Sequence, residues 1–331
     1  MENRKRKVQK RLINANVLKR IPSENECKKL FREYKERKGM ICPKCGCTHW
    51  YWIGGKLQHH RCKNCNYHSS IRSNTIMHYS KLSFRMWWLA MYIITQTKNS
   101  ISAAELQRQL GHKYYRPVYT LLMKIRRVMQ VSNMNTVLDK DVEIDEAFFS
   151  VKKTDADLNP NYNPKKRNSH KYVHSGGKAQ IVVMAESKPI ENFDRKKYTI
   201  PRAVGRIRFA YIWDTKADTL KNVVEDKVAP TASVISDGTY SHKHFKEMFS
   251  GYYGRKYKTT EELMTALPYV HIMIGNAKAL IRNIHHAVSR EYIMKYLEEF
   301  SWKFNHRNDE NMMDNLMLDA CVGRFSHFVF G

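Results

Sequence analysis

Two acidic residues, Asp145 and Glu146, lie inside an apolar and aromatic run, DVEIDEAFFS at 141–150, of a chain whose formal charge is +27. An unpaired buried charge is costly, so these acids need a partner. Asp237 directly follows a second strand-like run, SVIS. Carboxylates that are brought together by strand pairing raise each other's pKa unless a cation lies between them. The pattern therefore predicts oxygen ligation of Mg²⁺ or Mn²⁺ and, on a phosphate backbone, phosphoryl transfer.

Only one of the two adjacent acids can face such a metal, because successive side chains of a strand point to opposite faces. We expect Asp145 to be the ligand and Glu146 to face the other side. Considered alone, either acid is more often a salt-bridged or turn residue, so the assignment depends on the pair formed by Asp145 and Asp237.

Four of the seven cysteines form two Cys-x-x-Cys pairs, Cys42 with Cys45 and Cys62 with Cys65. Four thiolates from two such turns complete the tetrahedral shell of a structural zinc ion. The alternative, free buried cysteines, does not account for the paired spacing. Residues 41–72 therefore predict a zinc ribbon. We expect a rigid platform for contacts and not a catalytic centre, because a closed shell leaves the metal no open position.

Three helices are expected between residues 80 and 130, with polar breaks at 97–102 and 111–114. The last two flank Gly111, and helix, glycine-containing turn and helix are the signature of a helix-turn-helix. The second of them buries one face and can present cations to a DNA groove. These cations are Arg116, Lys124, Arg126 and Arg127. An ordinary helical hairpin with a solvated charged face is the alternative.

The composition predicts a polyanionic partner, because the chain has 58 Lys and Arg against 31 Asp and Glu. Eight of these cations and one acid lie in residues 1–20, which we expect to form an extended basic arm. No run of 18 apolar residues and no signal peptide is found, which argues against a membrane as the partner. The chain has seven cysteines, an odd number, and four of them form two close pairs. This pattern fits metal binding in a reducing compartment better than disulfide bonds, so we expect the protein to be intracellular.

The elements that must position the acids form a mixed α/β sheet. The first three strands suggest an antiparallel meander, and a helix at about 216–227 leads to the fourth. Expected strands lie at 142–151, 179–187, 206–215 and 233–238. An amphipathic helix is expected at 289–305, and a capping box at Ser23 and Glu26 predicts a helix that ends near Gly39. The polar stretch 154–178 reads as a long functional or disordered loop.

The chain resembles insertion-sequence transposases of the zinc-ribbon type, relatives of the eukaryotic Merlin transposases, over about residues 40 to 320. The segments that carry the resemblance are the paired cysteines, KIRRVMQ, VEIDEAFFS, SDGTYSH and IGNAKALIRNIHHAVSREYIMKYLEEFSWKFNHR. It implies an RNase H-like catalytic fold, recognition of terminal inverted repeats, cleavage at the ends of a mobile element and strand transfer into target DNA. It also implies double-stranded DNA as partner and a homo-oligomer on DNA, in the cytoplasm or nucleoid of a bacterium or the nucleus of a eukaryote.

The resemblance further implies two acids and a third polar metal ligand, carried here onto Asp145, Asp237 and His271, which is 34 residues after Asp237 (271 minus 237). Many such enzymes have Glu at the third position and Lys or Arg seven residues later, where this chain has Lys278. Lys278 would contact the DNA phosphate or brace the site. Asn276 competes with His271, and Glu298 or Glu299 could supply the missing carboxylate.

The predicted organisation has five parts. A basic arm with a short helix occupies 1–40 and a zinc ribbon 41–72, followed by a helix-turn-helix domain at 80–132. An RNase H-like catalytic domain at 138–310 and a C-terminal tail at 311–331 complete the chain. Besides a transposase, the sequence allows a catalytically inactive DNA-binding protein derived from one, or an RNA-processing nuclease.

Overall fold

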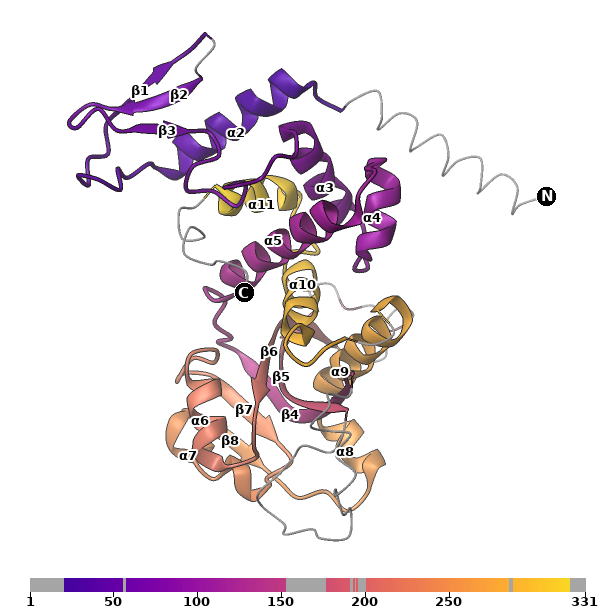
Figure 1. The fold of residues 1–331 in the computed structure, drawn as a ribbon. Helices are drawn as coiled ribbons and strands as arrows, with labels where there is room; N and C mark the ends of the chain where they lie inside the picture. The colour runs from indigo at the N-terminus through magenta and orange to yellow at the C-terminus, as the bar shows by residue number, and fades with distance from the viewer. Residues whose placement is uncertain are drawn as a thin grey trace, which may run out of the picture. The chain divides into compact units, whose positions relative to one another are not determined.

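A computed structural model describes residues 21–55, 58–152, 177–190, 193, 195, 201–285 and 288–321. The predicted basic arm at 1–20 and nearly all of the loop predicted at 154–178 lie outside these ranges. The chain divides into two compact units, each built from separate segments (Figure 1). The first unit takes residues 1–97, 103–128 and 311–331, and the second takes 98–102 and 129–310.

The described part of the first unit starts just before α2 (Glu24–Lys38), whose predicted capping box is confirmed. The Ser23 side chain accepts the Glu26 N–H, and the Glu26 carboxylate accepts the Ser23 N–H. A three-stranded antiparallel sheet follows, formed by β1 (Trp50–Ile53), β2 (His59–Cys62) and β3 (His68–Ser70) in that order. This sheet occupies the segment in which we predicted the zinc ribbon.

Three helices follow the sheet, with breaks where the sequence predicts them. They are α3 (Phe84–Gln96), α4 (Ala103–Leu110) and α5 (Tyr115–Asn133). Gly111 connects α4 to α5 with a φ of 63°, a left-handed conformation that glycine adopts without steric cost. The apolar stripe of α5 is buried, as expected from its spacing; it comprises Val118, Leu121, Leu122 and Ile125.

Within the segment predicted as the C-terminal tail, a helix, α11 (Met312–Ala320), belongs to the first unit. It packs against α2 and α3. The Tyr34 hydroxyl donates to Asp314, and the Lys38 Nζ lies 3.3 Å from Asp319 Oδ1. Pairing with a distant part of the chain holds this segment, and such pairing leaves no local signal in the sequence.

The second unit is built on a five-stranded sheet with the order β6-β5-β4-β7-β8. Strand β5 is antiparallel to both β4 and β6, and β7 is parallel to both β4 and β8, so the predicted meander and mixed sheet are confirmed. We did not predict β8. The strands are β4 (Asp141–Ser150), β5 (Lys178–Pro189), β6 (Arg202–Ile212), β7 (Ser233–Ser236) and β8 (Gly251–Gly254).

Helices cover both faces of this sheet (Figure 1). On one face, α9 (Pro268–Leu280) and α10 (Ile293–Asn305) form a core with odd-numbered residues of β4 such as Ala147 and Phe149. On the other face, α6 (Ala217–Glu225) and α7 (Phe245–Met248) pack with even-numbered residues such as Ile144. Because side chains alternate along a strand, Asp145 belongs to the α9 face and Glu146 to the α6 face.

Within the described ranges, none of the helices combines the length and apolar character that a membrane crossing requires.

Candidate metal centres

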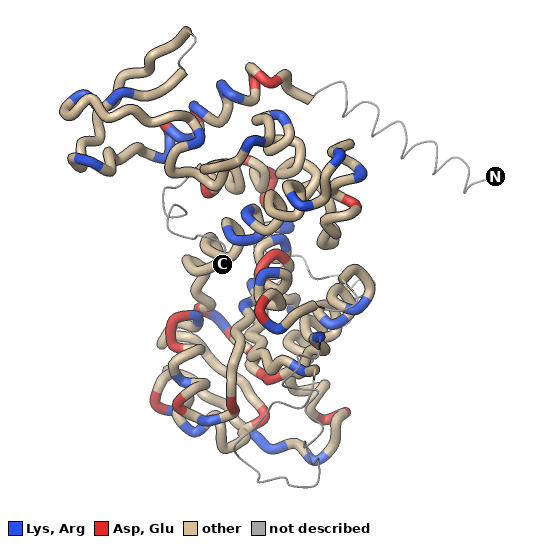
Figure 2. The backbone as a smooth tube through the Cα atoms, viewed as in Figure 1, with Lys and Arg blue, Asp and Glu red and all other residues tan. Residues whose placement is uncertain are grey.

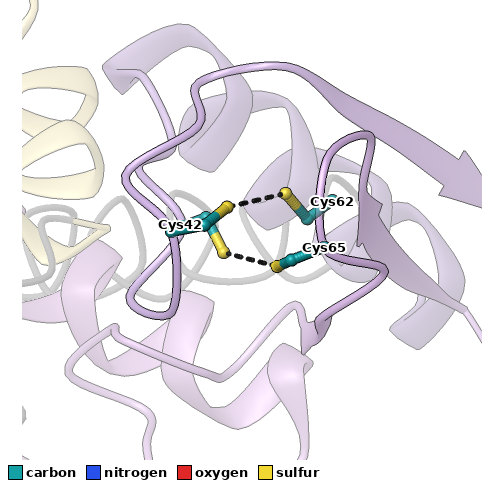
Figure 3. A group of neighbouring side chains, drawn as sticks. Cys42, Cys62 and Cys65 are labelled. Carbon is teal, nitrogen blue, oxygen red and sulfur yellow. Dashed lines mark hydrogen bonds between the residues drawn. The ribbon is translucent and has the colours of Figure 1, made fainter.

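The four paired cysteines converge. Their Sγ atoms all lie within 4.8 Å of one another, with 3.5 Å between those of Cys42 and Cys65 and 3.6 Å between those of Cys45 and Cys62. Figure 3 shows the sulfur atoms of Cys42, Cys62 and Cys65 pointing toward a common centre. Tetrahedral thiolates at a Zn–S distance of about 2.3 Å place sulfur atoms about 3.8 Å apart, so this donor set fits one zinc ion.

The two cysteine turns repeat the same backbone geometry. The N–H of Gly46 donates to the carbonyl of Cys42, and the N–H of Asn66 donates to that of Cys62. Both Gly46 and Asn66 have a left-handed φ, 71° and 58°. Burial raises the pKa of the Cys62 thiol, but hydrogen bonds from the backbone of Cys65 and Asn64 lower it to about 6. These backbone donors thus favour the thiolate form of Cys62, the form that zinc requires.

The two aspartates of the second unit lie on adjacent strands. Ile144 of β4 pairs with Ser236 of β7, so the next residues along these parallel strands, Asp145 and Asp237, are neighbours. Burial raises the pKa of Asp145 to about 6, and the negative charges of Glu146 and Asp237 add to the effect. Two crowded carboxylates of this kind fit a divalent cation, which would remove their repulsion.

A buried histidine, His242, connects the two faces of the sheet next to these acids. Its Nδ1 lies 3.0 Å from Asp237 Oδ1 and its Nε2 lies 3.0 Å from Glu146 Oε1. Burial opposes protonation, but the two hydrogen bonds to the carboxylates raise the pKa of His242 to about 9. The resulting imidazolium fixes one oxygen of Asp237 and neutralises Glu146. Glu146 therefore faces away from Asp145, as expected, yet remains coupled to Asp237.

Helix α9 brings His271 to Asp145. The His271 Nδ1 lies 3.8 Å from Asp145 Oδ2, and the His271 Nε2 is buried with no hydrogen-bond partner among the described residues. Burial, together with the nearby charge of Lys278, lowers the pKa of His271, which favours a neutral, ligating imidazole. Lys278 lies seven residues on and is exposed, on the same side of the helix.

Asn276 lies on a different side of α9. It is five residues after His271, a rotation of about 140° around the helix axis, and its side chain is exposed. The three predicted ligands Asp145, Asp237 and His271 are less tightly gathered than the cysteines, which form the sole cluster with mutual distances within 4.8 Å among the described residues. An ion bridging the acids would need to draw these side chains together.

A further acid, Glu143, anchors the helix that carries His271. Its Oε2 accepts the backbone N–H groups of Tyr269 and Val270, each at 2.8 Å, in the first turn of α9. The N-cap residue of α9, Leu267, makes no side-chain capping bond, so Glu143 acts as the cap from another element. Burial raises the pKa of Glu143 to about 7, although the two N–H donors oppose the shift.

The two acids of α10 have other partners. The Glu298 Oε2 accepts the side-chain amide of Asn133, and the Glu299 Oε2 accepts the Ser100 hydroxyl at 2.7 Å while its Oε1 lies 3.2 Å from the Lys303 Nζ. Both acids are buried in these networks. They are therefore poor candidates for the third metal ligand.

The four cations predicted to face DNA are placed unequally on α5. Arg116 is exposed. Arg126 is only 1% exposed, which contradicts the outward orientation expected of it. Lys124 is half-buried, with its Nζ donating to the carbonyl of His78 at 2.8 Å, and a DNA contact by Lys124 stays a prediction. Arg127 is half-buried. The amphipathic pattern of α5 predicts one buried face and one solvent-exposed charged face. It does not reveal that most residues around the helix are buried or half-buried.

Sequence reasoning missed His242 and Glu143. His242 contacts Asp237, which is close to it in the sequence, but its other partner, Glu146, is 96 residues away, and only the folded chain brings the three side chains together. Glu143 did carry a signal, because it precedes Asp145 by two residues and must share its face of the strand. A buried acid at that position needs hydrogen-bond donors, which the free N–H groups of a helix start can supply.

Comparison with known proteins adds two findings. Residues 137–305, just over half of the chain, match the ISXO2-like transposase domain. An uncharacterized protein in transposable element ISH50 of Halobacterium salinarum is 25% identical over 133 residues. That alignment covers 40% of this chain and 44% of the relative, so the chain spans less than half the length of that protein.

Proposed function

Because the chain belongs to the ISXO2-like transposase family of insertion sequences, we propose that it is an active DNA transposase that cuts the ends of its element and joins them to target DNA. The observation that carries the proposal is the meeting of Asp145 and Asp237 on adjacent strands, with His271 3.8 Å from Asp145. The five-stranded mixed sheet fits the RNase H-like fold that such enzymes use, for which we propose residues 138–310.

We assign the catalytic metal to Asp145, Asp237 and His271. When bound, Mg²⁺ or Mn²⁺ would activate the attacking hydroxyl group and stabilise the leaving oxygen. The residues of the chain hold this arrangement: His242 orients Asp237, and Glu143 fixes the start of α9. Lys278, exposed on the same side of α9 as His271, would bind the phosphate beside the cleaved bond.

His271 is preferred to Asn276 as third ligand because it is the residue of α9 that approaches Asp145. A histidine in place of a carboxylate lowers the negative charge of the site by one and suits Mn²⁺ better than Mg²⁺. We therefore expect faster cleavage with Mn²⁺, no cleavage by His271→Ala, and a shift toward Mg²⁺ in His271→Glu. Cleavage that survives His271→Ala and is lost in Asn276→Ala would assign the ligand to Asn276.

The first unit would bind double-stranded DNA at the terminal inverted repeats. In this proposal the four cysteines hold a structural zinc, and α4 and α5 form a helix-turn-helix domain in which Arg116 reaches the DNA. The full chain would assemble as a homo-oligomer on paired element ends, because joining two ends to one target requires more than one copy at the same place.

A catalytically inactive DNA-binding protein is the second candidate, favoured by the absence of a carboxylate at position 271. A cleavage assay separates the two. The full chain is incubated with Mn²⁺ and labelled duplexes that carry the genomic sequences flanking its gene, with a scrambled duplex and an RNA duplex as controls. Nicking of the flanking duplexes that is lost in Asp145→Asn and Asp237→Asn supports the enzyme. Binding without any nicking supports the inactive protein, and preferential cutting of RNA supports a nuclease.

A further inference from the structure

One face of the small sheet in the first unit carries an open row of side chains. Strand pairing places Tyr51 opposite Arg61, and Arg61 opposite His68, so the three residues cross all three strands in line. All three are exposed, with Tyr51 at 50%. The Lys63 Nζ lies 4.8 Å from the centre of the Tyr51 ring, which adds a second cation to the row.

Partners on α2 account for other side chains of the sheet but not for this row. The His60 Nε2 lies 2.9 Å from Glu36 Oε1, and the Arg32 guanidinium lies 4.9 Å from the centre of the Trp52 ring. His60 and Ser69 are buried, whereas the row formed by Tyr51, Arg61 and His68 is exposed. The row is therefore a surface and not part of the core.

The surrounding sequence has an unusual charge. Residues 37–104 contain ten Lys and Arg and no Asp or Glu. Figure 2 shows the same absence of acidic residues along β1, β2 and β3. None of the side chains of this stretch therefore repels a polyanion, and its cations have no acidic neighbours within the stretch.

We infer that this sheet face, defined by Tyr51, Arg61, Lys63 and His68, binds the backbone of duplex DNA. The inference deepens the proposed function, on which it rests. The planar guanidinium of Arg61 can hold a phosphate with two hydrogen bonds, and Lys63 supplies a second positive charge beside it. The rigid ring of Tyr51 packs against a sugar with little loss of entropy.

The contrast with α5 supports this assignment. Lys124 donates to a backbone carbonyl inside the first unit, and Arg126 is buried. The sheet face, in comparison, presents both of its cations at the surface. Contacts to phosphate position a protein on DNA without reading its sequence, so this face would hold the DNA while other residues select it.

The test measures binding of a fluorescent DNA duplex to the full chain over a series of salt concentrations. A plot of log affinity against log salt concentration has a negative slope, and each phosphate contact that is removed makes this slope less steep by about 0.9. We expect that change in Arg61→Ala and in Lys63→Ala, about twice as much in the double variant, and several-fold weaker binding without a slope change in Tyr51→Ala. Arg61→Lys should keep the slope because it keeps the charge.

Lys29→Ala is the matched control, because Lys29 is an exposed cation of the same unit that pairs with Glu33 at 3.9 Å. Its slope should equal that of the unaltered chain, and the zinc content of every variant should be unchanged. An unaltered slope in the double variant, while the unaltered chain binds normally, overturns this surface alone. An unaltered chain that does not bind duplex DNA, or that prefers duplex RNA, overturns both this inference and the proposed function.

Discussion

The Glu143 carboxylate links the strand of Asp145 to the helix of His271. Its removal should lower both the stability of the fold and the rate of DNA cleavage. Glu143→Ala leaves two helix-start N–H groups without their acceptor and should lower the free energy of unfolding by about 1 to 2 kcal/mol, the usual cost of a lost cap. Urea unfolding measures this loss. Cleavage should slow by more than the unfolded fraction explains, because His271 loses its fixed distance from Asp145.

Glu143→Gln provides the control for that prediction. Its side-chain oxygen still accepts an N–H group, so it should recover most of the stability and much of the cleavage rate at saturating Mn²⁺. Equal cleavage by Glu143→Ala and the unaltered chain, compared at the same folded fraction, would show that Glu143 only stabilises the fold.

A second buried acid, Glu186 of β5, predicts a pH effect on stability. Burial raises its pKa, but hydrogen bonds from Arg206 lower it below the ordinary value of 4.5. A carboxyl group whose pKa is lower in the folded state than in the unfolded state stabilises the protein at any pH above the unfolded-state pKa. This contribution is lost as the pH falls through the folded-state pKa. The stability of the unaltered chain should therefore fall more steeply below about pH 4.5 than that of Glu186→Gln.

Thermal or urea unfolding at a series of pH values measures this difference. The Arg206 Nη2 lies 2.8 Å from Glu186 Oε1 and 2.8 Å from Asp139 Oδ1. Asp139→Asn is therefore the matched variant, and because the Asp139 side chain is 54% exposed its effect should be smaller. Parallel pH profiles for the unaltered chain and Glu186→Gln would contradict the prediction.

At the scale of elements, the two cysteine turns should depend on zinc for their fold. The binding free energy of structural zinc is largely folding free energy in small modules of this kind. Cys45→Ser, or a strong chelator, should therefore release the metal and unfold β1, β2 and β3. The purified chain should contain about one zinc per molecule, as expected for one complete four-thiolate shell. Metal analysis and hydrogen exchange provide the measurements.

The second unit supplies the internal control for the zinc experiment. Its sheet and its two packed faces contain none of the four ligands, so amides of β4 and β5 should keep their protection in Cys45→Ser. Cys47→Ser should change neither zinc content nor protection, because Cys47 lies outside the four-sulfur cluster. Loss of protection in β4 after zinc removal would mean that the units do not fold independently.

The elements that could be predicted from sequence are those with a strong local pattern. The alternation in β4, the capping box at Ser23 and the Cys-x-x-Cys spacing each encode their own structure. Strand β8 was missed because GYYG has two glycines and no apolar alternation. The positions of Asp145 and Asp237 relative to their strands followed from the same patterns. The contact between His242 and Glu146 and the buried state of Arg126 depend on the folded chain, and no local pattern predicts them.

For the whole molecule, the charge of +27 should make DNA binding strongly dependent on salt. Residues 1–20 hold eight Lys and Arg and one Glu, so their deletion should lower the salt slope while leaving the order of preference among DNA sequences unchanged. Competition between flanking and scrambled duplexes measures that preference. If the truncated chain no longer distinguishes the two duplexes, the arm reads sequence and is not merely an electrostatic tether.

Helix α11 imposes an order of events on the synthesis of the chain. A ribosome releases residues from the N-terminus onward, so all of the second unit has emerged before Met312 appears. The surfaces of α2 and α3 that α11 covers therefore stay exposed until α11 has been synthesised. A nonsense codon near residue 310 would leave every proposed catalytic residue in place, yet the product would expose an unfinished N-terminal unit to proteases.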